Sequence, residues 1–218
     1  TIYDFGKTEQ VAYMAMEFLE GQELKDLIAS GQIPPAETVV DIIAQVADGL
    51  SFAHQQDIVH RDVKPSNIMV MKNSLAKITD FGIARLPNSA VKTMTGLILG
   101  SPRYMSPEQV IGKAIDARSD IFSLGVVLYE MLDGRPPFEA TSPHDYLLIH
   151  SKETQFRPLS LPAELPGSTD LQGVMKRALE RDRDKRYATA ADFASVLEAV
   201  EKTLPGPLDT TIETNMPV

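Results

Sequence analysis

The chain has 218 residues, 43% of them hydrophobic, which is enough to bury a core as one domain. Its formal net charge of −9 argues against nucleic acid or an anionic membrane surface as the main partner. The chain has no cysteine, which excludes a disulfide framework, a cysteine-ligated zinc site and a thiol nucleophile.

Two features concern the membrane and the start of the chain. The longest apolar stretch, around residues 121–132, is too short and too closely flanked by charge to span a bilayer. The first residues contain no positively charged n-region and do not form a signal peptide. Because Thr1 opens strand-like sequence, we expect the chain to be a fragment that begins inside a domain.

The first quarter of the chain predicts a β-hairpin followed by two helices. Residues 2–5 and 11–18 are rich in β-forming side chains and are separated by a polar turn, as in a hairpin. A short helix is expected at residues 23–29, where Gly31 and two following prolines stop it. Apolar residues then recur at helical spacing over residues 37–55, which predicts a long amphipathic helix.

Short strands and one long loop are expected in the middle of the chain. The strands lie at residues 58–59, 68–71 and 77–79, with a polar turn between the last two. Residues 83–108 hold Gly, Pro, Ser and Thr without a sustained period, so they predict a long ordered loop. Loops of that length in compact domains are usually functional or disordered.

The C-terminal half predicts a helical body. Residues 120–132 are apolar nearly all round, which is typical of a helix buried in the centre of a domain. Three more helices are expected at residues 143–151, 168–179 and 189–202. Residues 203–218 carry three prolines and no period, so we expect a flexible linker or tail there.

Two motifs carry the chemistry. Residues 60–67 read HRDVKPSN, and a separate DFG follows at Asp80, Phe81 and Gly82. Together they place a carboxylate, a lysine, an asparagine and a second carboxylate where phosphoryl transfer needs them. The His, Arg, Asp, Lys and Asn of the first motif would occur by chance at this spacing roughly once in three million windows at average residue usage. The motif is therefore not accidental.

At these motifs the chain resembles the eukaryotic-type protein kinases. The sequences of its motifs (HRDVKPSNIMV, TDFGIAR, RSDIFSLGVVLYEML) are similar to those of bacterial Ser/Thr kinases. The resemblance implies an α+β fold, with a remnant β-hairpin of the N-lobe and a complete, mainly helical C-lobe. Residues 1–202 would form an incomplete kinase domain that lacks the Gly-rich loop, the lysine of the third strand and helix C. Residues 203–218 would follow as the tail.

The resemblance implies four residues that act in phosphoryl transfer. Asp62 would accept the proton of the substrate hydroxyl and orient it toward the γ-phosphate. Lys64 would reach the transferring phosphoryl group as a compact cation. Asn67 and Asp80 would supply hard oxygen ligands to Mg²⁺, or to Mn²⁺, together with the phosphates of ATP.

The segment YMAMEFLEG resembles the hinge that binds the adenine of ATP. Adenine needs backbone donors and acceptors and an apolar slot. The resemblance places Met16 at the gatekeeper position and Glu17 and Leu19 as backbone contacts. Glu23 would lie near the ribose, and Met69 would form the floor under the ring.

The resemblance also implies packing and regulatory residues around the base. His60 would pack in the interior, and the position of Phe81 would distinguish active from inactive states. Arg61, beside the base, would pair with a phosphorylated residue of the long loop. Thr93 and Thr95 are the candidates for that phosphorylation.

A third motif, GSPRYMSPE, resembles the peptide-binding segment of the family, with Ser106 in place of its usual alanine. The resemblance implies that the hydroxyl of Ser101 contacts the base and its lysine. Glu108 would pair with Arg186 and clamp this segment to the last helices. Asp120, at the start of the central helix, would hydrogen-bond the backbone of the HRD turn.

The implied activity is that of a Ser/Thr protein kinase, which transfers the γ-phosphoryl group of ATP to Ser and Thr hydroxyls of proteins, including its own activation loop. The implied partners are ATP, protein substrates and a second copy for trans-autophosphorylation, with no nucleic acid. A cytoplasmic domain is expected, with any membrane anchor outside these residues.

Two other classes of protein stay open on the motifs. One is a catalytically dead pseudokinase or scaffold, although the chemical residues of this lobe are all present. The other is a small-molecule phosphotransferase of the aminoglycoside or choline type, against which Lys64, Glu108 and Arg186 favour the protein kinase. The 218 residues alone are expected to be inactive or nearly so, because they lack the phosphate-covering loop and its lysine.

Overall fold

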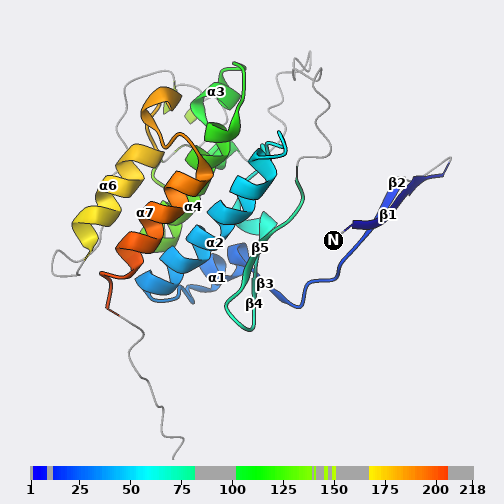
Figure 1. The fold of residues 1–218 in the computed structure, drawn as a ribbon, viewed down its shortest axis with the longest axis horizontal. Coiled ribbons are helices and arrows are strands. Elements are labelled where there is room, and N and C mark those ends of the chain that lie inside the picture. Colours follow the sequence, from blue (N-terminus) through cyan, green and yellow to red (C-terminus); the bar gives the residue numbers. More distant parts are fainter. Residues whose placement is uncertain are drawn as a thin grey trace, which may run out of the picture.

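The computed structural model in Figure 1 describes residues 2–8, 12–81, 102–138, 140, 145–146, 149–150 and 167–205. The described strands are β1 (Ile2–Lys7), β2 (Ala12–Met16), β3 (Gly21–Glu23), β4 (Ile68–Met71) and β5 (Ala76–Ile78). The helices are α1 (Leu24–Ser30), α2 (Ala36–His54), α3 (Pro107–Val110), α4 (Ala117–Asp133), α6 (Ser168–Ala178) and α7 (Ala190–Glu201). Short 3₁₀ turns are η1 (Pro65–Asn67), η2 (Pro102–Tyr104) and η3 (Arg183–Lys185).

The described strands form two separate antiparallel sheets. β1 pairs with β2, with Lys7 opposite Ala12, and this hairpin stands apart from the helical body in Figure 1. β3, β4 and β5 form the second sheet in that order, and β5 lies against α2. Gly21 allows β3 to approach β4 closely, because an added Cβ would lie 2.6 Å from the carbonyl oxygen of Val70.

The core lies between four helices. α4 runs through its centre and is buried on nearly every face from Ser119 to Met131. α2 and α6 each pack against both α4 and α7, and Figure 1 shows α2 and α7 side by side. Gly125 of α4 permits the close packing of α6, because a Cβ there would lie 2.9 Å from the Cβ of Ala178. No helix in the described residues combines the length and apolar character that a membrane crossing requires.

The α+β architecture predicted from the sequence is confirmed, with small antiparallel sheets and a mainly helical body. The expected strand at residues 58–59 is wrong. Asp57 has a φ of 58°, and the amide of Ile58 donates to the carbonyl of Ala53, so the chain turns back on α2 instead of pairing. β3 was not expected, and the described part of the expected loop at residues 83–108 contains η2 and α3.

The packed body also continues past the expected boundary at residue 202. The Thr203 hydroxyl donates to the carbonyl of Val200 at 2.7 Å, and Leu204 is buried in the core. Leu204 packs where the absent side chain of Gly167 leaves space. The expected tail is therefore wrong at its start, and residues 206–218 lie outside the described part. Of the helix expected at residues 143–151, the described residues 145–146 and 149–150 are helical.

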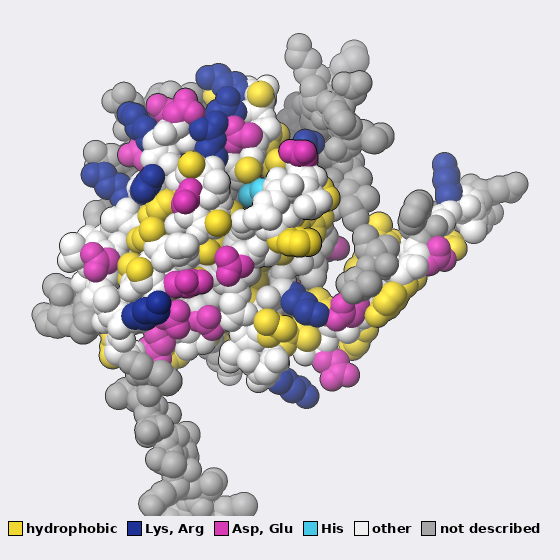
Figure 2. Space-filling view, viewed as in Figure 1, with side chains coloured by type: hydrophobic (Ala, Val, Ile, Leu, Met, Phe, Trp, Pro, Cys, Tyr) yellow, Lys and Arg dark blue, Asp and Glu magenta, His cyan; other side chains and the backbone are white. Residues whose placement is uncertain are grey.

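The surface over α2 and α7 is acidic, as Figure 2 shows. Acidic residues of these two helices include Glu37, Asp41, Asp48, Glu198 and Glu201. Partial burial raises the pKa of the Glu201 carboxyl, and the negative charges of Asp41 and Glu198 raise it further. This face therefore carries several carboxylates close to one another.

His150 is a buried histidine in this core. Its side chain is 5% exposed, and its ring meets the rings of Phe122 and Phe138 edge-on at 5.7 and 5.3 Å between centroids. Neither ring nitrogen has a hydrogen-bond partner among the described residues. Burial, together with the positive charges of Arg181 and Arg186 and against the charge of Glu108, lowers the pKa of His150 from 6.5 to about 4.

We expect stability to fall as the pH drops through this window. The folded-state pKa lies below that of the unfolded chain, so between about pH 6.5 and about pH 4 the unfolded state binds more protons and gains stability relative to the fold. The loss from this group approaches about 3 kcal/mol, since each pKa unit is worth ~1.4 kcal/mol. Melting temperatures of the whole protein across this range, with His150→Phe as the control, measure the effect. An equally steep pH dependence in His150→Phe would contradict it.

Candidate active site

One buried carboxylate holds the turn that contains HRD. Asp120 in α4 is 1% exposed, and its two oxygens accept the backbone amides of His60 and Arg61, each at 2.8 Å. Arg61 has a φ of 67°, a left-handed conformation that costs a non-glycine residue about 1 kcal/mol or more. The two charge-assisted hydrogen bonds offset this cost and fix the direction in which the next residue, Asp62, leaves the turn.

A second histidine joins this anchor, and the sequence reasoning missed it. His54 Nε2 lies 2.8 Å from Asp120 Oδ2, so the last turn of α2 is tied to the same carboxylate. The signal was present, because His54 follows Val46 and Leu50 at a spacing of four on the buried side of α2. A histidine on a buried stripe needs a polar partner, and Asp120 supplies it.

Three of the predicted catalytic residues, Asp62, Lys64 and Asn67, contact one another. Lys64 Nζ lies 2.7 Å from Asp62 Oδ2, and Asn67 Nδ2 donates to the Asp62 carbonyl at 2.8 Å and to Oδ2 at 3.3 Å. η1 brings Asn67 back, because Pro65 opens the turn and the Asn67 amide closes it on the Lys64 carbonyl at 2.9 Å. The side chains of Asp62 and Lys64 are 34% and 24% exposed, so a substrate hydroxyl can reach the carboxylate.

The segment after β5, which carries the second carboxylate, packs against the HRD region. The Thr79 amide donates to the Asn67 carbonyl at 2.8 Å, and the Thr79 carbonyl lies 2.9 Å from His60 Nε2. Asp80 follows with a φ of 57°, and its side chain is exposed. Phe81 then packs on the His60 ring at 4.7 Å between centroids. His60 therefore acts as a structural bridge between the two motifs.

Asn67 and Asp80 suit a divalent cation by their chemistry. The amide nitrogen of Asn67 is used on Asp62, and the one contact of Oδ1 among the described residues is the Ser66 hydroxyl, at 3.4 Å. Among the described residues, no group of three or more His, Asp or Glu forms a complete metal cage. Mg²⁺ is usually bound by one or two protein ligands together with phosphate oxygens, so an incomplete pair of this kind fits a metal that a nucleotide completes.

Two of the predicted nucleotide-binding residues lie side by side. Glu23 is opposite Met69 in the β3–β4 pairing, so the residue expected near the ribose adjoins the residue expected under the adenine. Glu23 also pairs with Lys25 at 2.8 Å. The sheet therefore places these two side chains on neighbouring strands at one edge of the helical body.

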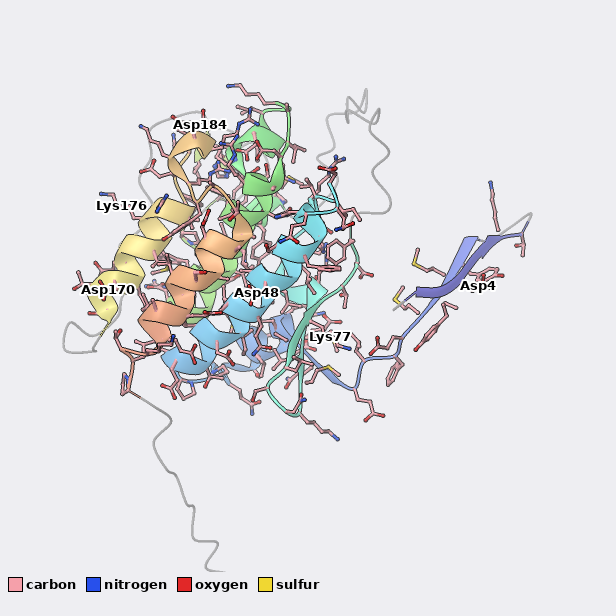
Figure 3. The ribbon with its side chains drawn as sticks, viewed as in Figure 1. Asp4, Asp48, Lys77, Asp170, Lys176 and Asp184 are labelled. Atoms are coloured by element: carbon pink, nitrogen blue, oxygen red, sulfur yellow. The ribbon has the colours of Figure 1, made fainter. Side chains whose placement is uncertain are left out.

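The other three hinge residues lie on the chain between the hairpin and the body. Met16 is 47% exposed at the end of β2, and the Leu19 carbonyl accepts the Gly21 amide at 3.1 Å. Glu17 Oε1 lies 2.8 Å from Lys77 Nζ on β5, which faces this connection (Figure 3). The expected hinge is thus tied to the strand that leads to Asp80.

Glu108 and Arg186 form a buried bidentate ion pair. Arg186 Nη1 and Nη2 lie 2.7 and 2.9 Å from the two Glu108 oxygens, and the Ser119 hydroxyl donates to Glu108 at 2.6 Å. Arg186 also donates to the carbonyls of Glu180, Arg118 and Arg181. Burial alone would raise the pKa of Glu108, but Arg186 and Ser119 outweigh burial and hold it below its usual value.

Ser106, the departure from the family's alanine, caps α3. Its hydroxyl accepts the Gln109 amide at 3.4 Å, and the Gln109 side chain accepts the Ser106 amide at 2.9 Å, which makes a reciprocal capping box. Gln109 Nε2 also donates to the Arg61 carbonyl at 2.8 Å. The serine therefore orients a glutamine that joins the start of α3 to the HRD turn, a role that sequence reasoning did not assign.

Four residues named from the resemblance lie outside the described residues: Gly82, Thr93, Thr95 and Ser101. The described chain stops at Phe81, next to the second carboxylate, and resumes at Pro102, where η2 begins. The intervening residues 82–101 therefore connect Asp80 to the segment that ends in the Glu108 clamp.

One turn carries a carboxylate, a lysine and an asparagine, and the adjoining segment carries a second carboxylate, which are the residue types that phosphoryl transfer uses. A sequence model of the protein kinase domain matches residues 1–198. The chain is 39% identical over 209 residues to the serine/threonine-protein kinase PknB of Mycobacterium leprae, which covers 94% of this chain and 33% of that protein. It is 39% identical over 201 residues to a probable serine/threonine-protein kinase of Clostridium perfringens, which covers 92% of this chain and 29% of that protein.

The chain therefore belongs to the protein kinase domain family. It spans about a third of the length of the curated relatives that it matches. The fold agrees with this membership, because the N-terminal hairpin is followed by a mainly helical body with a short sheet, as expected from the resemblance.

Proposed function

We propose that the whole protein is a serine/threonine protein kinase that transfers the γ-phosphoryl group of ATP to Ser and Thr hydroxyls of proteins. The observation that carries the proposal is the cluster of Asp62, Lys64 and Asn67, which the buried Asp120 holds at an accessible surface. The names of the relatives support the same activity.

In the proposed mechanism, Asp62 orients the acceptor hydroxyl and takes its proton as the oxygen attacks phosphorus. Lys64, which is 2.7 Å from that carboxylate, stabilises the negative charge that develops on the transferred group. Asn67 holds the carboxylate in place through Nδ2, so the base is oriented before the substrate arrives.

Protein kinase domains use ATP with a divalent metal ion, and we propose Mg²⁺, with Mn²⁺ as a substitute. Asn67 Oδ1 and the Asp80 carboxylate would hold the metal, which would neutralise charge on the phosphates when bound. The sheet edge that carries Glu23 and Met69 would take the ribose and the adenine ring. Met16, Glu17 and Leu19 would complete the adenine site.

The test is a transfer assay with the whole protein and ATP that carries a labelled γ-phosphate. Label should enter a protein acceptor such as casein, in a reaction that needs Mg²⁺ or Mn²⁺. Choline and an aminoglycoside, offered in place of protein, should accept none. Transfer to a small molecule and not to protein would favour a small-molecule phosphotransferase, and absence of transfer to any acceptor would favour a pseudokinase.

We also propose activation by phosphorylation of Thr93 and Thr95, by a second copy acting in trans. The proposed receiver is Arg61, whose Nε is buried and has no hydrogen-bond partner among the described residues. A phosphate adds a charge of roughly −1.5 to −2 and three acceptor oxygens, which an unpaired guanidinium nitrogen is suited to bind. The domain itself would lie in the cytoplasm, with any membrane anchor outside these residues.

The Thr93→Ala, Thr95→Ala double variant should have activity roughly tenfold lower than wild type. Phosphates on these threonines would supply charge-assisted hydrogen bonds that order the loop, and the variant cannot form them. Phosphopeptide mapping of the whole protein after incubation with ATP should find phosphate on one or both threonines. Asn88→Ala, in the same segment, is the control and should retain activity. A double variant as active as wild type would reject the switch.

A further inference from the structure

Arg103 is a half-exposed cation on the same side of α4 as the segment that joins the catalytic turn, and the phosphoryl-transfer chemistry leaves it without a role. It lies in η2, between residues 82–101 and the α3 segment that Gln109 fastens to the Arg61 carbonyl at 2.8 Å. Its side chain is 46% exposed. A protein substrate that brings a hydroxyl to Asp62 must pass over this segment if the segment forms the peptide-binding surface.

The Arg103 guanidinium is held by the buried carboxylate of Glu130. Arg103 Nη1 lies 3.1 Å from Glu130 Oε1, and the Tyr104 hydroxyl donates to Glu130 Oε2 at 2.6 Å. The Glu130 side chain is 5% exposed. Burial and this hydrogen bond raise the pKa of Tyr104 well above its usual value, so the hydroxyl stays a donor. Partial burial alone would lower the pKa of Arg103, but Tyr146 and Glu130 raise it, which keeps the cation charged.

We propose that Arg103 is a specificity-determining residue that selects protein substrates with an Asp or Glu close to the acceptor Ser or Thr. The proposal rests on the proposed kinase function. A guanidinium has five N–H donors, and in Arg103 one of them is used on Glu130 and another on Tyr146. The others can pair with a substrate carboxylate in the planar, two-point geometry that arginine favours.

The same arrangement disfavours basic substrates. The carboxylate that Arg103 contacts, Glu130, has both of its oxygens occupied by Arg103 and Tyr104. A substrate Lys or Arg would therefore meet a guanidinium before it met a free carboxylate, and like charges at close range repel.

The distance between the acceptor Ser or Thr of a substrate and its acidic residue can be estimated from α4. Asp120 anchors the catalytic turn and Glu130 anchors Arg103, ten residues apart on one helix. This separation is about 15 Å along the helix axis at 1.5 Å per residue. An extended peptide covers that distance in about four or five residues, so the acidic side chain should lie within that span of the acceptor.

The experiment measures transfer by the whole protein to a Ser peptide in which a single Asp, Ala or Lys is moved one position at a time along both flanks. At the preferred position, wild type should favour Asp over Ala about five- to tenfold in kcat/KM, and Lys should be the poorest. Arg103→Gln should reduce the Asp-to-Ala ratio to about one, and Arg103→Glu should favour Lys. Arg103→Lys should keep part of the preference, because it keeps the charge but loses the planar fork.

The control is Arg183→Gln, which changes an arginine in η3 that pairs with Asp116 at 3.2 Å. This variant should retain the wild-type preference. Removing Arg103 leaves the buried Glu130 without its cation, so melting temperatures of all variants show whether the protein has stayed folded. If Arg103→Gln unfolds, Arg103→Lys, which keeps a cation beside Glu130, still tests the preference. A flat preference in wild type, or an unchanged Asp-to-Ala ratio in Arg103→Gln, would overturn the proposal.

Binding separates this inference from the kinase function. The same peptides with a fluorescent label are titrated by anisotropy, without any need for transfer. Tighter binding of the Asp peptide by wild type, lost in Arg103→Gln, supports the acidic subsite even if no phosphoryl group moves. Equal binding of the Asp, Ala and Lys peptides overturns it, whether or not the protein is an active kinase.

Discussion

Asp62→Asn in the whole protein should reduce kcat by roughly a thousandfold while the dissociation constant of ATP changes less than a few-fold. General-base catalysis contributes ~10²–10⁴ to rate, and an amide cannot take the hydroxyl proton. The substitution keeps the shape of the side chain, so the turn held by Asp120 should remain folded. Steady-state kinetics give kcat, and titration with a non-hydrolysable ATP analogue gives the affinity.

Asp80→Ala is the comparison that tests the assignment of roles. This carboxylate is proposed to hold the metal and not to touch the acceptor hydroxyl, so its loss should also weaken binding of Mg-ATP. Asp62→Asn should not do so. If both variants lost nucleotide binding to the same extent, the division between base and metal ligand would be wrong.

Glu108→Ala and Arg186→Ala should each lower the free energy of unfolding by ~3–5 kcal/mol, because each leaves one charge buried without its partner. The two side chains are 6% and 0% exposed in their ion pair, so solvent screens the remaining charge poorly. For a domain of this size the loss corresponds to a melting temperature lower by roughly 10 °C. Differential scanning calorimetry of the whole protein measures it, and activity should fall with stability.

An exposed ion pair in the same region serves as the matched control. Arg118 pairs with Asp184 at 2.6 Å, but the Asp184 side chain is 77% exposed. Asp184→Ala should therefore change stability by no more than about 1 kcal/mol. Unchanged melting temperatures in both Glu108→Ala and Arg186→Ala would show that the buried pair contributes no net stability.

The chemical residues were predictable from the sequence because their spacing is local. Asp62, Lys64 and Asn67 lie within one turn, so the motif and the proline that opens η1 are enough to expect them together. The link to Asp80 spans more of the chain, and it rests on the β4–β5 pairing and on the Thr79 amide, which donates to the Asn67 carbonyl at 2.8 Å. The resemblance to the kinase family predicted that Asp80 belongs with the first motif, whereas the residue patterns alone did not predict it.

The polar anchors were harder to predict, because each depends on a partner far along the chain. His54 meets Asp120 across 66 residues, and Gln109 meets Arg61 across 48. Glu130 could have been suspected, since a carboxylate inside an apolar helix requires partners. Nothing local indicated that Arg103 and Tyr104 supply them. Tertiary packing also decided where the body ends, because Leu204 is buried by contacts that a Pro-containing segment does not reveal.

The most direct measurement is mass-spectrometric identification of the phosphorylated residues after the whole protein, ATP and Mg²⁺ are incubated with a protein acceptor. The wild type should place phosphate on serine and threonine side chains of the acceptor, and Asp62→Asn should place none above background. Phosphate absent from protein with the wild type, or present at equal levels with Asp62→Asn, would contradict the proposal that this cluster is the active site of a protein kinase.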